Sequence, residues 1–287
     1  MDLTSVTVFI PSFQQPELLQ RCVDAVLNCI SARIVILDDS FDNSVKDEVE
    51  KIRHTWETEQ IDFFGRLAQK ERISHISSWN RYKGIINNNT ALSREFINIR
   101  HHDDHLIRHH SKNISLDFRK VSECRLIIHP IVTQHGKIGK VRFYRYHCTP
   151  GLLRLLVKHL PPELLFIFNY IGPTACVWVR SDLVGDAPVF DEQLEWLVDV
   201  FWYYSLMKRC MKSQIRVSEG GLNITEVNMH SITRKLRPNI GEIAKKERQY
   251  ISKTIKLSAW LYLMAAVLRA LNKILSLMWL KSSVYDV

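Results

Sequence analysis

The stretch "EFINIRHHDDHLI" at residues 95–107 carries an apolar run into two histidines, two aspartates and a third histidine. Adjacent carboxylates such as Asp103 and Asp104 repel each other, and a bound divalent cation is one way to hold them together. Mg²⁺ or Mn²⁺ takes oxygen ligands from one or two carboxylates together with the phosphates of a substrate. The alternative is a solvated junction between a strand and a loop, because aspartate commonly begins turns. The stretch therefore predicts either a metal site or a turn, and the three histidines could contact the metal, a phosphate or neither.

A second pair of carboxylates, Asp38 and Asp39, ends the apolar run "RIVILDDS" at residues 33–40. A carboxylate in this position is well placed to accept hydrogen bonds from the base or ribose of a nucleotide. A role in a turn or as a helix cap is at least as common for this sequence. Both interpretations stay open at this point.

The elements around these carboxylates form a βαβ pattern typical of an α/β fold. Residues 6–13 are β-branched and predict a strand, residues 15–28 have apolar positions at helical spacing, and residues 33–40 predict a second strand. Residues 95–105 predict a third. Parallel crossovers of this kind are almost always right-handed, and open α/β sheets bind ligands at the carboxyl ends of their strands. The two carboxylate pairs therefore indicate one candidate site.

Further elements are expected before and after the third strand. A charged helix around residues 46–57 precedes an aromatic-bearing stretch, and residues 74–90 indicate a loop entering a helix. Later elements are two strands around a turn at Gly136 to Gly139 and, within 151–165, a short helix stopped by Pro161 and Pro162. A buried strand is expected after Gly172 and Pro173, and an amphipathic helix within 190–210 has apolar residues at 194, 197, 201, 204 and 207.

The composition suits one large domain or two modest ones, since 46% of the 287 residues are hydrophobic. Six cysteines without a CxxC pair favour reduced thiols and a cytoplasmic protein, and the N-terminus has no secretory signal pattern. Residues 234–287 hold 11 Lys/Arg against 3 Asp/Glu, which is +8 of the formal net charge of +9. Because the basicity belongs to this tail, we expect no nucleic-acid partner.

The order of the motifs resembles that of the family 2 glycosyltransferases of the GT-A fold, over residues 5–235. The segments that carry the resemblance are "VTVFIPSF", "ILDDSFDNS", "SSWNRYKGI", "HHDD", "IGPTACVWVRSD", "FDEQLEWLVDVFWYYSL" and "EVNMHSITRK". The resemblance implies a Rossmann-like, nucleotide-sugar-binding α/β domain at 1–235 with a mixed central sheet. Residues 236–287 would follow it as a basic, amphipathic helical tail.

The resemblance also implies roles for individual residues. It places the nucleotide-sugar at Pro11, Ser12, Asp38, Asp39, Asn80, Arg81 and Asp103, the metal at Asp104, Asp103 and His230, and the acceptor at Gly172, Pro173, Glu195 and Trp196. The family's catalytic base corresponds to Asp199. Many members have Glu-Asp where this chain has Val198-Asp199, so only the aspartate matches the family pattern.

The chemistry of an inverting sugar transfer is consistent with these roles. A base must deprotonate the acceptor hydroxyl, and a cation must stabilise the departing nucleoside diphosphate. Asp199 is expected to be the base and Asp104 the main metal ligand, with Glu195 as the rival base. Three of the predicted site residues also have a plainer interpretation. Asp199 could be an exposed helix residue, Trp196 a core aromatic rather than a sugar-stacking one, and His230 a solvent-facing histidine. Arg234 and Lys235 could reach the diphosphate or simply begin the basic tail.

The tail predicts a helix over Leu257–Leu280, with apolar residues at 257, 260, 261, 264, 267, 268, 271, 274, 275 and 278 on one face and Arg269, Asn272, Lys273 and Ser276 on another. Placing Arg269 and Lys273 at a bilayer centre would cost about 2.5 to 3.5 kcal/mol each, which argues against a membrane span. A helix lying on an anionic cytoplasmic leaflet fits the flanking cations. Packing on the catalytic domain or on a partner chain is the alternative.

The expected activity is transfer of one sugar from a UDP-, GDP- or dTDP-sugar to a glycan or polyprenyl-diphosphate-linked acceptor, with Mn²⁺ or Mg²⁺ as cofactor. The resemblance implies a bacterial enzyme of surface polysaccharide synthesis, such as lipopolysaccharide O-antigen or capsule. The basic amphipathic tail indicates a cytoplasmic protein that is peripheral at the inner face of the cell membrane, and a homo-oligomer is a further alternative. Inversion is expected, although the residues alone are also compatible with retention. The alternatives are a nucleotidyltransferase, whose glycine-rich basic loop is not found after the first strand, and a membrane-recruiting module without catalysis.

Overall fold

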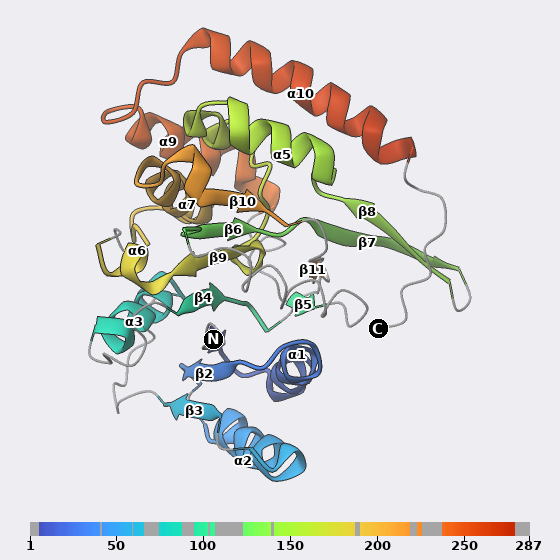
Figure 1. The fold of residues 1–287 in the computed structure, drawn as a ribbon, viewed down its shortest axis with the longest axis vertical. Helices are drawn as coiled ribbons and strands as arrows, with labels where there is room; N and C mark the ends of the chain where they lie inside the picture. Colours follow the sequence, from blue (N-terminus) through green and yellow to red (C-terminus); the bar gives the residue numbers. More distant parts are fainter. Residues whose placement is uncertain are drawn as a thin grey trace.

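A seven-stranded mixed sheet forms the centre of the molecule (Figure 1). The computed structural model describes residues 6–40, 42–58, 60–65, 75–87, 95–102, 104–106, 123–138, 141–186, 190–218, 223–225 and 237–278. The strand order is β10-β6-β9-β4-β1-β2-β3. The strands are β1 (Val6–Ser12), β2 (Arg33–Asp38), β3 (Ile61–Phe64), β4 (Phe96–Ile99), β6 (Leu126–Ile128), β9 (Val177–Arg180) and β10 (Ile215–Val217).

The strand order reverses at β1. Strands β2 and β3 continue the parallel sheet on one side of β1, and β4 pairs with β1 in parallel on the other. Strand β9 runs antiparallel to both β4 and β6, which makes the sheet mixed. The predicted α/β class with a mixed central sheet is therefore confirmed, and the switch point of the sheet lies beside β1.

Strand β1 shows why the apolar runs in this half are continuous. All seven of its residues are buried, because both faces of the sheet are covered. Phe9 packs with Trp79 and Tyr82 of α3 (His75–Asn87), while Val8 and Ile10 pack on the opposite face against α1 (Pro16–Cys29) and α2 (Ser44–Trp56). In Figure 1, α1 and α2 accordingly lie on one side of the sheet and α3 on the other.

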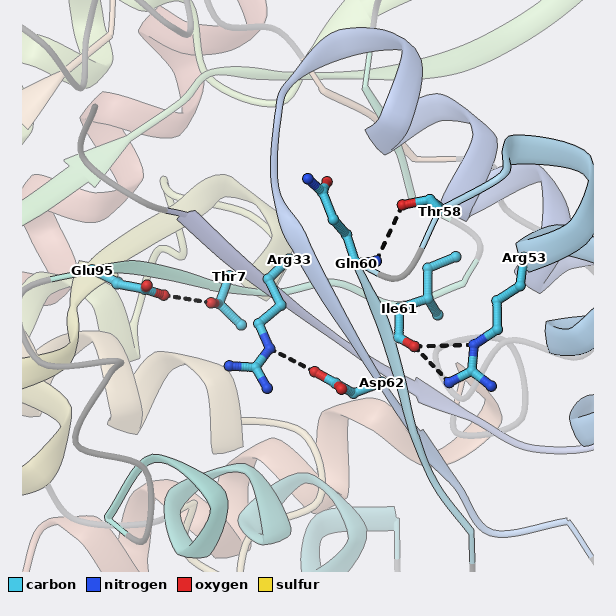
Figure 2. Close-up of polar contacts among 8 residues, drawn as sticks. All are labelled: Thr7, Arg33, Arg53, Thr58, Gln60, Ile61, Asp62 and Glu95. Atoms are coloured by element: carbon cyan, nitrogen blue, oxygen red, sulfur yellow. Dashed lines mark hydrogen bonds and ion pairs between the residues drawn. The ribbon is translucent and has the colours of Figure 1, made fainter. Parts of the chain in front are cut away.

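The amino ends of the strands are held together by polar contacts between neighbouring elements (Figure 2). Thr7 of β1 donates a hydrogen bond to Glu95 just before β4 at 2.7 Å, and Arg33 at the start of β2 pairs with Asp62 of β3 at 2.5 Å. Arg53 of α2 donates through two guanidinium nitrogens to the Ile61 carbonyl. These polar side chains at the amino ends of the strands therefore connect neighbouring elements of the sheet.

A second sheet of order β5-β11-β7-β8 lies beside the first. Its strands are β5 (Asp104–Leu106), β11 (Asn223–Thr225), β7 (Ile131–Ile138) and β8 (Val141–Tyr146). The expected turn at Gly136 to Gly139 is wrong in its first half, since Gly136 lies within β7 at a register shift after Gln134. Glycine inside a strand commonly marks such an irregularity rather than a turn.

The helices after β8 are α5 (Pro150–His159), α6 (Ser181–Asp186) and α7 (Val198–Lys208). Helix α7 starts at Val198, so the helix expected within 190–210 begins later than its periodicity suggested. Its buried residues also do not follow the predicted face, because Trp202 and Tyr203 are enclosed while Phe201 and Tyr204 are only half-buried. The helix is packed on several sides, and a one-sided apolar stripe is a property of surface helices.

Helices α9 (Ile240–Ile251) and α10 (Ala259–Met278) complete the described chain. Figure 1 places α10 at the end of the molecule opposite α2 and β3. Five residues of α10 are buried against the rest of the protein: Leu261, Ala265, Leu268, Asn272 and Ser276. Asn272 and Ser276, which the sequence placed on another face than the apolar residues, lie on the packed side with Leu261, and Asn272 bonds to backbone groups of His147 and Thr149.

Candidate functional site

The carboxyl ends of β1, β2 and β4 meet at the switch point of the large sheet, where the sequence predicted a ligand site. Ser12, the last residue of β1, is paired in register with Asp38, the last residue of β2. On the other side, the backbone N–H of Arg100, which follows β4, donates to the Phe9 carbonyl at 2.9 Å. These three strand ends place the two predicted groups of carboxylates on one edge of the sheet.

The end of β2 is fixed by hydrogen bonds to its carboxylates. Asp38 is buried, and its Oδ1 accepts a hydrogen bond from the Ser40 backbone N–H at 3.0 Å. Burial raises the pKa of Asp38, and the bonds from Ser40 oppose that shift. Ser40 Oγ in turn accepts from the backbone N–H of Gln14, a residue with a φ of 49°. The loops after β1 and β2 are thus tied to each other.

Arg81 of α3 links the ends of β2 and β3. Its Nη1 donates to Asp39 Oδ1 at 3.0 Å and to the Asp38 carbonyl at 3.2 Å, while Nη2 donates to the carbonyls of Phe64 and Gly65 at 3.1 Å each. A planar guanidinium can serve several acceptors at once, which an ammonium cannot do in the same way. The structure therefore brings together Arg81, Asp38 and Asp39, as the sequence expectation required.

Asn80, the neighbour of Arg81, makes different contacts. Its Oδ1 accepts from the Phe190 backbone N–H at 2.7 Å and its Nδ2 donates to the Phe190 carbonyl at 3.0 Å. The Asn80 amide therefore holds the segment that leads into α7. Pro11 and Ser12 are buried in β1, and the Pro11 carbonyl lies 3.5 Å from the His102 ring.

Between β4 and β5 the chain turns at His102, and the Asp104 N–H donates to the His101 carbonyl at 3.0 Å. Cys22 of α1 contacts the same turn, with its Sγ 3.6 Å from both the His101 and the Asp104 carbonyl oxygens. The His101 ring meets Trp79 of α3 edge-on, with ring centroids 4.6 Å apart. Asp104 is 1% exposed. The described part of this stretch therefore contains a turn at His102 and an enclosed Asp104 carboxylate, and the metal site stays a prediction.

Asp199, the predicted base, lies in the first turn of α7. Its side chain is half-buried rather than exposed, and its Oδ1 is shielded from solvent without a hydrogen-bond partner among the described residues. Burial raises the pKa of Asp199 to about 6; the nearby His101 opposes this rise and the Asp104 carboxylate adds to it. The plainer interpretation of Asp199 as an exposed helix residue does not hold.

Three residues near the Asp104 and Asp199 carboxylates were not identified from the sequence. Arg100 and Cys176 are completely buried, and Cys176 has a pKa raised by burial and then by the Asp104 charge, which Arg100 opposes. Tyr203, one helical turn after Asp199, donates its hydroxyl hydrogen to the Gly172 carbonyl at 3.1 Å. A cation immediately after a buried strand was the one signal that could have identified Arg100.

The backbone conformation at position 172 requires a glycine. Its φ is 104°, which side-chain-bearing residues rarely adopt, and a Cβ added there would lie 3.0 Å from Ile131 Cγ2. Pro173 follows in extended conformation. The Gly172 carbonyl accepts a hydrogen bond from Tyr203, so this segment, which was predicted to lie on the acceptor side, is held near α7.

The start of α7 is held by Glu247 of α9, which is also missed by sequence reasoning. Glu247 is buried, and its carboxylate accepts backbone hydrogen bonds from Glu195 at 2.6 Å, Trp196 at 3.0 Å and Leu197 at 2.7 Å. A negative charge at a helix N-terminus satisfies free N–H groups and interacts favourably with the helix dipole. Glu195 itself is exposed and the Trp196 side chain packs half-buried on the core.

The ligands predicted for a divalent cation are only partly within the described residues. Asp104 offers a buried carboxylate, the oxygen donor that Mn²⁺ and Mg²⁺ prefer. Asp103 and His230 lie outside the described residues, as do Arg234 and Lys235. Within the described ranges, no three His, Cys, Asp or Glu side chains form a group that could hold a metal ion. Asp104 therefore fits one position of a metal site, which the described residues do not complete alone.

No protein-family model matches the sequence, and no curated protein matches it. Solved structures do match the fold. A mannosyltransferase from Pyrobaculum calidifontis, in complex with GDP-Man and Mn²⁺, matches with a TM-score of 0.51 and 12% identity, over 94% of this chain and 75% of that one. Residues 1–349 of S. aureus TarS, in complex with UDP, match with a TM-score of 0.54 and 12% identity, over 94% and 70%.

A third match is glucosyl-3-phosphoglycerate synthase from Mycobacterium tuberculosis, in complex with Mn²⁺, UDP-glucose and phosphoglyceric acid. Its TM-score is 0.52 with 13% identity, over 87% of this chain and 79% of that one. The chain therefore has the GT-A fold, and the apolar helix α10 follows in the C-terminal part that the structure describes.

Proposed function

We propose that this protein transfers a sugar from a nucleotide-diphosphate sugar to an acceptor hydroxyl, with inversion and with Asp199 as the general base. The observation that carries the proposal is the position of Asp199 in the first turn of α7, where its Oδ1 is shielded from solvent without a hydrogen-bond partner among the described residues. Burial at this position raises the pKa of Asp199 to about 6. A general base works best when its pKa lies near the operating pH. The fold adds support, because the matched glycosyltransferases are complexes with GDP-Man, UDP-glucose and UDP.

In the proposed reaction, Asp199 takes the proton of the acceptor hydroxyl while that oxygen bonds to the anomeric carbon of the sugar. The bond between this carbon and the diphosphate oxygen breaks, and the electron pair leaves with the nucleoside diphosphate. Asp38, Asp39 and Arg81 would bind the nucleoside part at the ends of β2 and β3. Gly172 would orient the acceptor through its contact with Tyr203.

A divalent cation, Mn²⁺ or Mg²⁺, is part of the proposal. Asp104 would hold it together with Asp103 and His230, and the cation would neutralise the charge of the departing diphosphate. Support comes from the buried Asp104 carboxylate and from Mn²⁺ in two of the matched structures. Membership of family 2 and an acceptor in bacterial surface polysaccharide, glycan or polyprenyl-diphosphate-linked, rest on the sequence resemblance.

The test is calorimetric titration of UDP, GDP and dTDP, each with and without Mn²⁺, into the wild type and Asp104→Asn. We expect one nucleotide to bind in a Mn²⁺-dependent manner and Asp104→Asn to lose most of that binding. Asp62→Asn is the matched control, since Asp62 is a carboxylate at the opposite edge of the same sheet. Failure of all three nucleotides to bind would overturn the proposal, and binding that ignores both Mn²⁺ and Asp104 would remove the metal from it.

A further inference from the structure

Helix α10 is attached to the protein by a side that is partly polar. Asn272 Nδ2 donates to the His147 carbonyl at 2.8 Å, and the Arg269 guanidinium donates to the Ile167 carbonyl. Ser276 is fully buried on the same side. These contacts orient the helix, because turning it about its axis would leave buried backbone groups without their partners.

The opposite side of α10 is an apolar stripe that the described residues do not cover. Its members follow helical spacing and are each 41% to 63% exposed: Trp260, Leu263, Val267, Leu271 and Ile274. At 1.5 Å rise per residue the stripe is about 21 Å long. Continuous exposed apolar surface of this kind marks an interaction site rather than ordinary protein surface. The single face predicted from the sequence is therefore divided, with half packed inward and half exposed.

The surroundings of the stripe are strongly basic. Residues 237–278 contain eight Lys/Arg and two Glu, and one of these, Glu247, is buried at the start of α7. Lys253 and Lys256 are exposed just before α10, and Lys273 is exposed on it. An apolar stripe with adjoining cations is the pattern of a helix that lies in the surface of a membrane containing anionic lipids.

Helix α10 satisfies the length and composition criterion for a membrane span over Ala259–Ser276, with 22% of that window buried. Its polar contacts argue for a different placement, because spanning would withdraw Asn272 and Arg269 from the carbonyls that they bond. A second copy of this chain is also disfavoured as the occupant. In a two-fold interface the same face lies on both sides, so Lys256 and Lys273, which adjoin the stripe, would approach lysines of the second copy.

We infer that the exposed stripe of α10 inserts into the interfacial layer of a bilayer containing anionic lipid, with the helix parallel to the membrane plane. The protein would then be held with this end of the molecule toward the lipid (Figure 1). This inference does not depend on the proposed transferase activity, since it uses only the contacts, exposure and charge of the tail.

The experiment is co-sedimentation of the full chain with phosphatidylcholine vesicles, with or without phosphatidylglycerol. We expect binding to the vesicles with phosphatidylglycerol to be at least tenfold stronger and to weaken with salt. The triple variant Leu263→Gln, Val267→Gln and Ile274→Gln should lose at least tenfold of this binding. Met211→Gln is the matched control, because Met211 is 65% exposed outside the stripe and should bind vesicles like the wild type.

The variants must keep their fold, which a melting temperature close to that of the wild type would show. Equal vesicle binding by the triple variant and the wild type would overturn the inference. So would a dimer in light scattering that the triple variant dissolves while vesicle binding is absent in both, since a second copy would then cover the stripe.

Discussion

Two pairs of aspartates, Asp38 with Asp39 and Asp104 with Asp199, differ in the hydrogen bonds that their carboxylates receive. Asp38 and Asp39 receive hydrogen bonds from the Ser40 N–H and from Arg81. Asp199, by contrast, interacts with the charge of buried Asp104, and its Oδ1 has no hydrogen-bond partner in the described part of the chain. Carboxylates with matched donors build structure, whereas a carboxylate that lacks them holds its proton more tightly and can exchange it near neutral pH.

The largest expected effect is loss of turnover in Asp199→Asn. General base catalysis contributes about 10²- to 10⁴-fold, so kcat should fall by at least about 10²-fold while nucleotide affinity changes little. The free energy of unfolding should stay the same or rise, because a buried charge is removed. Steady-state kinetics and thermal unfolding measure both.

Glu195→Gln is the control for this substitution, because Glu195 is the exposed rival base. Its turnover should resemble that of the wild type. The reverse pattern, with Glu195→Gln inactive and Asp199→Asn active, would identify Glu195 as the base. The Asp104 and Asp199 pair would then have no catalytic role that distinguishes it from Asp38 and Asp39.

The second prediction concerns pH. With a pKa of about 6, Asp199 must be ionised to act as a base, so kcat/KM should fall about tenfold per pH unit below pH 6. Burial disfavours the charged form of Asp199, so ionisation of this carboxyl increases activity but decreases the free energy of unfolding. As the pH rises from 3.8 to about 6, the unfolded chain loses this proton before the folded chain does, and the free energy of unfolding decreases.

The size of that decrease is at most about 3 kcal/mol, from 1.36 kcal/mol per pKa unit, and solvent at the partly exposed side chain makes it smaller. The stability advantage of Asp199→Asn over the wild type should therefore be greater at pH 8 than at pH 4. Chemical denaturation at the two pH values measures this difference. An advantage that does not change with pH would mean that the carboxylate titrates normally.

The third prediction concerns Asp38 and Asp39 and uses the substitution Arg81→Lys. A lysine retains the charge but cannot serve the four acceptors of the guanidinium, so the free energy of unfolding should fall by about 1 to 3 kcal/mol. Nucleotide affinity should fall by about tenfold if the ends of β2 and β3 bind the nucleoside, a loss of about 1.4 kcal/mol. Unchanged stability and affinity would show that Arg81 is not what shapes this edge.

The comparison also explains which parts of the molecule were predictable from the sequence. Strands β1 and β2 and helix α1 follow from local patterns, since both faces of the sheet are covered and the helix buries one side. Strand β3 was missed because its four residues include the charged Asp62 and show no clear alternation. The resemblance assigned both Arg81 and Asp39 to the nucleotide-sugar site, but their pairing at 3.0 Å was not predicted from the sequence.

The state of Asp199 was less accessible to sequence reasoning. Its place on a helix within 190–210 was predicted, but its environment depends on residues remote in the sequence. Asp104 lies 95 positions earlier, and Glu247, which holds the start of α7, lies 48 positions later, in the segment that the sequence assigned to a basic amphipathic tail. Such long-range contacts leave no local periodicity from which to infer them.

The smallest expected effect is that of Asp62→Asn at the amino edge of the sheet. The Arg33–Asp62 pair is short at 2.5 Å, but both side chains are at least one-third exposed, at 39% and 33%. Exposed ion pairs contribute about 0.2 to 1 kcal/mol and are screened by salt, so the free energy of unfolding should fall by less than about 1 kcal/mol. Asp38→Asn should cost more, because Asp38 is buried and accepts a backbone hydrogen bond. Urea denaturation at low and high salt would measure both variants, and an equal, salt-sensitive loss would mean that the two edges of the sheet do not differ as the contacts indicate.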